Sequence, residues 1–321
     1  MHKYTIVGDI HARPDNLDKV QKLFELVEDL GNPVIVLGDI FDTKEIIRGK
    51  VLNKLLKLFS SSRLHWDLLV GNHDMFNLDN AEEGHALTAL EMSGNLIFVT
   101  DKPIINYVDK MLRVPFSKDA NFLREALKDA KTNQVKYVFG HFDIATFDYG
   151  NGHISDHGLT VDDFKGFQKV ISGHYHAFQE LGNIVYLGTP FSHNFGESNQ
   201  RKFIAEFDTT TGALELIETT EIFPRHITLT CDMTTDTFDV SSVRIEDNHV
   251  RILAKGTAEQ LEKLPRIEGV KYVDEVVEGS IESETINESD SKEDQFVKWA
   301  KDVAKLEKET IALGLEVLKD V

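Results

Sequence analysis

Five short polar segments in the first 176 residues constrain this chain more than any other feature. They are GDIH at residues 8–11, GDIFD at 38–42, GNHD at 71–74, GH at 140–141 and GHYH at 173–176. Each follows an apolar run of strand length, such as residues 4–7, 34–37 and 68–70. Each segment therefore places aspartate, asparagine or histidine at the end of a strand. Side chains of these types in such positions are typical of a metal site.

The residue types indicate which metals would bind. Hard or borderline divalent ions take carboxylate oxygen and imidazole nitrogen, whereas a thiolate site needs several cysteines and Cys231 is the only one here. The candidate ligands are too many for one tetrahedral ion and suit two octahedral ions that share a carboxylate. They are Asp9, His11, Asp39, Asn72, His141, His174 and His176. Two ions roughly 3.5 to 4 Å apart favour in-line attack on a phosphorus ester, so we predict a dinuclear centre for phosphoester hydrolysis.

In this order, the five segments resemble those of the calcineurin-like metallophosphoesterases, whose pattern is D-x-H, GD-x-x-D, GNH-D/E, GH and GH-x-H. A lone Gly-His or Gly-Asp pair is commonly only a turn, but here the whole series is present over roughly the first two-thirds of the chain. The resemblance implies a four-layered α/β/β/α sandwich. It also implies that Asp39 bridges two ions, with Asp9, His11 and His176 on one ion and Asn72, His141 and His174 on the other.

The same resemblance implies catalytic roles for His73 and Asp42. His73 would face the substrate as an acid or charge stabiliser and would not bind metal. We expect the Asp42 carboxylate to hydrogen-bond to His73, fix its ring and favour the imidazolium form. The alternative is that Asp42 only caps a helix that begins near residue 45.

Residues beside the ligands indicate a branch of the family. Protein phosphatases continue the second motif with Arg-Gly, whereas Thr43 and Lys44 follow here. The sequences GDIFDT at 38–43 and VYLGTP at 185–190 resemble the SbcD-type nucleases, and among them most of all the phage recombination nuclease subunits. Eukaryotic and archaeal members of that branch carry histidine at the position of Asp42, whereas bacterial and phage members carry aspartate.

This branch implies a function and partners. It implies a subunit with DNA exonuclease or endonuclease activity in recombination and double-strand-break repair, using two divalent ions, Mn²⁺ first and Mg²⁺ as the alternative. DNA, an SbcC-type coiled-coil ATPase and a second copy of the chain are the implied partners. The homodimer would form through the helices near the metal motifs, although their leucines equally suit a larger core.

Two other classes remain open. A small-molecule phosphodiesterase or nucleotide phosphatase would use the same dinuclear centre, and the net charge of −19 favours it because a duplex binder commonly presents basic surface. Two divalent ions would offset part of that charge, and much of the acidity lies between residues 274 and 294, in what is most simply a solvated linker. A scaffold without catalysis is the third class, and the complete ligand set argues against it.

Composition and periodicity give the expected domain organisation. A hydrophobic content of 41% argues against disorder, and no apolar segment is long enough to span a membrane. We expect no membrane contact and a cytoplasmic protein, in the host cytoplasm if viral. Residues 1–220 would form the phosphoesterase (nuclease) domain and 221–280 a small α/β capping domain. Residues 281–321 would form an acidic linker and a C-terminal helix that binds the ATPase partner, with packing on its own domain as the alternative.

Secondary structure is expected as follows. Helices are predicted at residues 16–29, 45–59 and 81–92 of the first domain, and strands at 226–231, 250–254 and 270–277 of the second around a helix at 258–264. His157, with Asp148 and Asp156, is a candidate for the outer shell of the metal site, and His153 lies in the same loop. For the other histidines outside the motifs, a surface or core role is expected.

Overall fold

The computed structural model describes residues 3–277 except 45, 80–82, 95, 151, 236–244 and 246, together with 291, 295–297, 299–300 and 310–311. The chain divides into two compact units, one of Met1–Thr228 with Ile245–His249 and one of Leu229–Arg244 with Val250–Val321. Among the described residues, no helix has the length and apolar character needed to cross a bilayer. The acidic linker and C-terminal helix predicted for residues 281–321 lie largely outside the described residues.

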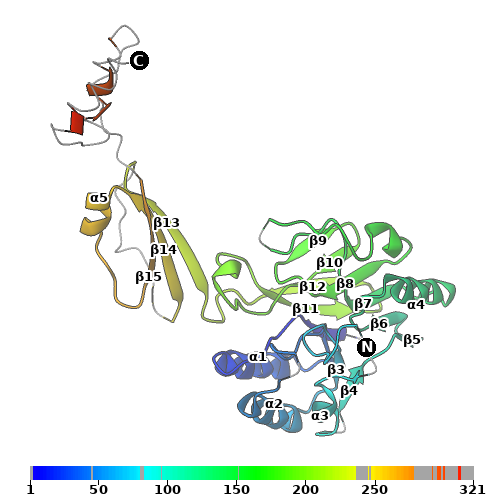
Figure 1. Cartoon of the computed structure of the whole chain (residues 1–321). Coiled ribbons are helices and arrows are strands. Elements are labelled where there is room, and N and C mark those ends of the chain that lie inside the picture. Colours follow the sequence, from blue (N-terminus) through cyan, green and yellow to red (C-terminus); the bar gives the residue numbers. More distant parts are fainter. Residues whose placement is uncertain are drawn as a thin grey trace. The chain divides into compact units, whose positions relative to one another are not determined.

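Two six-stranded sheets form the first unit (Figure 1). In spatial order, the first contains β12 (Ala213–Glu218), β11 (Phe203–Asp208), β1 (Lys3–Val7), β2 (Val34–Val36), β3 (Trp66–Leu69) and β4 (Ile97–Thr100). The second contains β5 (Ile104–Asn106), β6 (Met111–Val114), β7 (Tyr137–His141), β8 (Lys169–Gly173), β10 (Ile184–Tyr186) and β9 (Gln179–Leu181). Strands β1 to β4 are parallel, as are β6, β7, β8 and β10.

Alternation along the strands builds the layers, since successive side chains in a strand point to opposite faces of the sheet. Ile6 and Ile35 pack between the two sheets against residues such as Phe139. Their neighbours Val7 and Val36 point the other way and pack against the helices. The second sheet has its own outer core, which includes residues of α4 (Ala120–Thr132). The result is the predicted four-layered α/β/β/α sandwich, with α1 and α2 beside one sheet and α4 beside the other (Figure 1).

The first helix follows the sequence pattern closely. Helix α1 (Leu17–Leu30) buries Val20, Leu23, Phe24 and Val27, which recur at the spacing of one helical face. It ends at Gly31, whose φ of 72° is a left-handed conformation that glycine adopts without strain.

The next two helices are shorter than predicted. Helix α2 (Gly49–Ser61) begins four residues after the expected position 45, because Arg48 takes an extended conformation at its N-cap. Asp42 therefore does not cap this helix, and that alternative is wrong. Helix α3 (Thr88–Glu91) covers only the end of the predicted range 81–92, since His85 instead forms a bridge with Met75.

The second unit has a separate small core. Strands β13 (His226–Asp232), β14 (His249–Gly256) and β15 (Lys271–Val276) form a three-stranded sheet, and helix α5 (Ala258–Lys263) begins with a capping box. Its core residues are Cys231, Ile252, Ala254, Leu261 and Leu264. The predicted strands and helix of this region are all present, within two residues at each end.

Helix α2 offers a test of the outer core. Leu55 is fully buried between the helix and the first sheet, so Leu55→Ala should lower the free energy of unfolding by about 2 to 5 kcal/mol. Asn53→Ala, on the exposed face of the same helix, should change it by less than about 0.5 kcal/mol. Urea denaturation followed by circular dichroism measures both. Equal losses for the two variants would contradict this packing.

Candidate metal centre

The predicted ligands lie at or just beyond the carboxyl ends of five strands. Asp9 and His11 follow β1, Asp39 follows β2 and Asn72 follows β3, while His141 ends β7 and His174 and His176 follow β8. Because β1, β2 and β3 are mutually parallel, as are β7 and β8, the turns leave the same edge of each sheet. Contacts link all seven side chains into one cluster.

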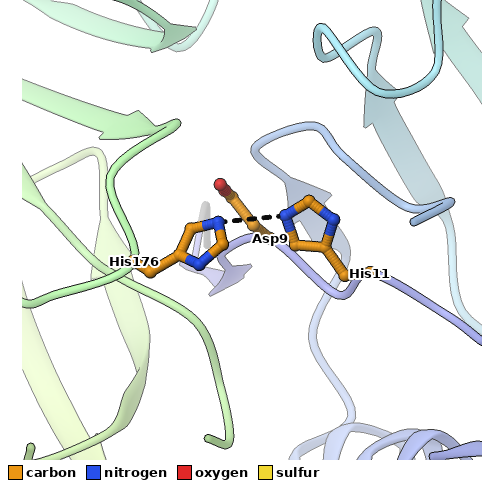
Figure 2. A group of neighbouring side chains, drawn as sticks. All are labelled: Asp9, His11 and His176. Carbon is orange, nitrogen blue, oxygen red and sulfur yellow. Dashed lines mark hydrogen bonds between the residues drawn. The ribbon is translucent and has the colours of Figure 1, made fainter. Parts of the chain in front are cut away.

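Asp9, His11 and His176 form the first part of the cluster (Figure 2). One potential ligand atom from each lies within 4.8 Å of the other two. Nε2 of His11 and Nε2 of His176 are 3.1 Å apart and face each other. Asp9 is fully buried and also accepts a hydrogen bond from the backbone amide of His174 at 2.9 Å.

Asn72, His141 and His174 form the second part. Oδ1 of Asn72 lies 2.9 Å from Nε2 of His141 and 3.0 Å from Nδ1 of His174. The other ring nitrogen of His141, Nδ1, donates to the carbonyl oxygen of Leu37 at 2.8 Å. This bond fixes the ring and directs Nε2 into the cluster.

Asp39 lies between the two parts. Its Oδ2 is 3.7 Å from Nε2 of His11 and 3.4 Å from Nε2 of His141, and the side chain is almost fully buried. Its other oxygen accepts the backbone amide of His73 at 2.7 Å. The carboxylate is thus within reach of ligands from both parts, as a bridging ligand would be.

The pKa values of the clustered side chains are shifted by burial and by their mutual charges. Burial raises the pKa of Asp9 to about 6, and it lowers the pKa of His11 and His174 to about 3. Burial also opposes the ionisation of Asp39, but His141, together with His11 and His73, outweighs that effect and holds the pKa of Asp39 below its ordinary value. Reciprocally, burial lowers the pKa of His141, but Asp39, Asp9 and the Leu37 carbonyl together outweigh burial and raise that pKa to about 9.

These groups fit divalent ions. The raised pKa of His141 favours a proton on that ring beside Asp39, and the lowered pKa values of His11 and His174 favour neutral rings with free lone pairs. Nδ1 of His11 is also buried without a hydrogen-bond partner among the described residues. Cations bound among these oxygens and nitrogens would replace the proton and satisfy the facing lone pairs. The donor set of carboxylate, amide oxygen and imidazole suits borderline or hard divalent ions.

Glycines allow the turns to approach this closely. A Cβ atom on Gly38, whose φ is 114°, would lie 2.4 Å from Nδ1 of His141. A Cβ on Gly173 would lie 2.4 Å from a carboxylate oxygen of Asp9. Three predicted ligands, His11, Asp39 and His174, themselves have positive φ values of 43°, 49° and 93°. Such backbone conformations are costly for residues with a side chain and cluster at functional sites.

Two supporting carboxylates were not predicted. Oε1 of Glu197 accepts from Nδ1 of His176 at 2.9 Å, and Oε2 pairs with the buried ammonium of Lys202 at 2.7 Å. Burial opposes its ionisation, but the hydrogen bond from His176 and the charge of Lys202, with the nearby His193, together outweigh burial and lower the pKa of Glu197 below its ordinary value. Glu197 lies 21 residues from His176, outside every motif, so no local pattern indicated the contact.

Asp74 is the second of these carboxylates. It is fully buried and accepts the backbone amides of Ile40, Phe41 and Gly71. It therefore joins the loop that carries Asp39 to the loop that carries Asn72. The sequence signal for Asp74 was its place at the end of the third motif. Nothing in the sequence showed whether its carboxylate would bind a metal ion or hold the loops by hydrogen bonds.

The contact between Asp42 and His73 differs from the prediction. Nδ1 of His73 lies 2.8 Å from the main-chain carbonyl oxygen of Asp42, not from its carboxylate. The carboxylate lies instead 3.7 Å from Nδ1 of His11 and 4.0 Å from the Arg13 guanidinium. The expected carboxylate–imidazole pair is therefore replaced by a carbonyl–imidazole bond. Ligand atoms of His73, His11 and Asp39 also lie within 4.8 Å of one another.

Other histidines take varied positions. His157 is largely exposed and pairs with Asp143 at 2.9 Å and Asp156 at 3.1 Å, and His153 stacks on Tyr149. These contacts of His157 do not include a predicted metal ligand. The carboxylate of Asp148 accepts hydrogen bonds from the backbone amides of Gly150 and Gly152 in the same loop. His193 was expected to be on the surface or in the core. It is buried, and its ring centroid lies 5.4 Å from that of His11 and 6.0 Å from that of His176.

Comparisons with known proteins agree with this arrangement. The model of the family described as calcineurin-like phosphoesterase matches residues 2–178, which contain all five motifs. Exonuclease subunit 1 of Enterobacteria phage T4 is 30% identical over 198 residues, which are 60% of this chain and 58% of that protein. The chain thus matches little more than half the length of this relative.

Solved structures are also similar in part. One is titled as a novel archaeal phosphodiesterase, with 16% identity, a TM-score of 0.37, and coverage of 67% of this chain and 99% of the other. Another is a hypothetical protein from Thermus thermophilus, with 13% identity, a TM-score of 0.37, and coverage of 67% of this chain and 98% of the other.

Glu197 should position His176 for metal binding. Glu197→Gln removes the charged acceptor of the Nδ1 proton, so it should weaken metal binding roughly 10- to 100-fold, as titration calorimetry would measure. Glu218→Gln is the control, because that carboxylate pairs with Arg201 on the surface and its loss should leave metal affinity unchanged. Unchanged affinity in a folded Glu197→Gln protein would refute the positioning role.

The His73 contact makes a second prediction. His73→Ala should lower kcat for a small diester by roughly 10² to 10⁴ if the ring acts as an acid. Asp42→Ala should keep kcat within a few-fold, because the carbonyl oxygen that holds His73 remains. Steady-state kinetics on bis-p-nitrophenyl phosphate measures both variants. A fall in kcat for Asp42→Ala as large as that for His73→Ala would show that the Asp42 carboxylate contributes to catalysis.

Proposed function

The chain belongs to the calcineurin-like phosphoesterase family, and from this premise we propose that it is a Mn²⁺-dependent DNA nuclease. Membership makes it a metal-dependent phosphoester hydrolase, and the family uses a dinuclear centre of divalent ions. The finer proposal is an exonuclease or endonuclease that cleaves DNA phosphodiester bonds during recombination and double-strand-break repair. Mg²⁺ is the alternative ion.

One observation carries the nuclease proposal. The relative named exonuclease subunit 1 matches 198 residues of this chain at 30% identity, and the seven clustered side chains are of the types that hold divalent ions. We propose that Asp9, His11 and His176 hold one ion, that Asn72, His141 and His174 hold the other, and that Asp39 bridges them. Ions held there would polarise the phosphoester and offset the negative charge that develops during displacement.

His73 is proposed to transfer a proton to the leaving oxygen. A carbonyl oxygen only accepts hydrogen bonds, so Nδ1 of His73 donates to Asp42 and keeps its proton. Nε2 is then the atom that can carry a second proton towards the substrate. The ring lies edge-on to His11, with centroids 4.7 Å apart, which places it beside the proposed first metal site.

We also propose two partners. The phage relative is named as a subunit, which supports an SbcC-type coiled-coil ATPase as a partner that residues 281–321 would bind. A homodimer formed through the helices near the metal motifs is part of the same proposal. Residues 221–280 would act as a cap that helps to position DNA.

A small-molecule phosphodiesterase or nucleotide phosphatase is the competing proposal. The observation that favours it is the net charge of −19, which repels a polyanion. The two proposals predict different substrates for the same centre.

The decisive experiment compares substrates under identical conditions. With Mn²⁺, the purified chain should cleave linear duplex DNA as well as bis-p-nitrophenyl phosphate, and Asp39→Ala should lose both activities because the bridging carboxylate is gone. Gel electrophoresis and absorbance at the nitrophenolate band provide the readouts. Turnover of the small diester or of nucleotides without any DNA cleavage would overturn the nuclease proposal and support the competing one.

A further inference from the structure

A concentration of basic residues stands out in this acidic chain. Residues 44–63 carry six cationic side chains and a single acidic one, although the whole chain has a net charge of −19. Helix α2 itself contains three lysines and no acidic residue. The cations are Lys44, Arg48, Lys50, Lys54, Lys57 and Arg63. The metal chemistry proposed above uses none of them.

The fold places several of these cations along two adjoining clefts. The first cleft, of about 380 Å³, is lined by Arg13 and Arg48 and by Ala12, which directly follows His11. The second, also of about 380 Å³, is lined by Lys50, Lys54 and Lys57. Pro14 and Asp15 line both clefts, so the two adjoin. We call these two adjoining clefts, with their five cations, the basic groove.

The groove begins beside the metal centre, since His193, which lines the first cleft, has its ring centroid 5.4 Å from that of His11. His193 lines the first cleft and is 4% exposed, and neither of its ring nitrogens has a hydrogen-bond partner among the described residues. Asp42, whose main-chain carbonyl holds His73, lines the same cleft. A buried imidazole with two unpaired nitrogens is costly unless a bound group or water satisfies it. This end of the groove therefore offers unpaired polar atoms to a polar ligand or to water.

The lysines of the groove are largely free of acidic partners. Lys54 donates to the neutral amide oxygen of Gln21, and none of the three lysines forms an ion pair in the part of the chain that the structure describes. Three acidic side chains also line the groove: Asp15, which pairs with Arg13 at 2.9 Å, and Asp18 and Asp42. Five cations against three carboxylates leave the groove net positive.

We propose that the basic groove binds the sugar–phosphate backbone of the DNA strand that enters the metal centre. The lysines lie four and three residues apart on α2, so Lys50 to Lys57 spans about 10 Å along the helix axis. One strand of duplex DNA carries a phosphate about every 3.4 Å along its axis, so this span faces roughly three phosphates. Phosphate contacts of this kind position a nucleic acid without reading its sequence.

This inference rests on the proposed nuclease function and adds a path for the substrate. It also accounts for DNA binding by an acidic chain, because local cations and not net charge decide where a polyanion binds. A small diester has no flanking phosphates and would not use the groove. Substrates of the two sizes therefore separate the groove from the metal centre.

The test is a variant with Lys50→Gln, Lys54→Gln and Lys57→Gln. Binding is measured by fluorescence anisotropy of a labelled linear duplex with cleavage-resistant phosphorothioate linkages, over a series of salt concentrations with Mn²⁺ present. We expect affinity to fall about tenfold or more, and the slope of log K against log salt to shrink by about 2.7, from three contacts at roughly 0.9 each. Hydrolysis of bis-p-nitrophenyl phosphate should stay within twofold of wild type.

A matched control removes the same charge elsewhere. Lys128, Lys136 and Lys165 are exposed and lie outside the groove, and their replacement by glutamine should leave both the affinity and the salt slope close to wild type. If the groove variant binds DNA as the control variant does, the groove proposal is overturned while the nuclease proposal stands. If the wild-type chain hydrolyses the small diester but neither binds nor cleaves DNA, both proposals fail.

Discussion

The structure depends on one electrostatic constraint, which is that a cluster of buried acceptors must be neutralised. Asp9 and Asp39 are almost completely buried, and the Nε2 atoms of His11 and His176 face each other at 3.1 Å. Burying charge or unpaired lone pairs costs several kcal/mol unless a cation compensates. The pKa of His141 is raised beside Asp39, which favours a proton on that ring as part of the compensation. The cluster is therefore arranged for cation binding at the expense of its own stability.

The rest of the first unit holds these groups in place. Two sheets direct the ends of parallel strands to one region, and glycines such as Gly38 and Gly173 let the turns pass within a distance that no Cβ would permit. Asp74 ties two of the loops together by accepting three backbone amides, and Glu197 fixes the ring of His176. Because rigid supports of this kind set ligand orientation, metal affinity and loop packing should be coupled.

The sequence was sufficient for some features and not for others. Strand-length apolar runs followed by Asp, Asn or His identified the seven candidate ligands, because a strand end and the residues after it form a pattern within a short stretch of sequence. Helix α1 is also encoded by a short stretch of sequence, which has one apolar face and a glycine at its end. Helix α3 was overpredicted, since the bridge between His85 and Met75 is a tertiary contact. Glu197 and the main-chain role of Asp42 were missed because they depend on how distant loops meet.

We propose that the cluster holds two divalent ions bridged by Asp39. The most direct measurement loads the metal-free chain with Mn²⁺, determines the bound stoichiometry by calorimetry and records the electron paramagnetic resonance spectrum. We expect two ions per chain and the spectrum of a spin-coupled Mn²⁺ pair, with coupling lost in Asp39→Ala. A saturating stoichiometry of one ion, or two ions with no magnetic coupling in the wild-type chain, would contradict it.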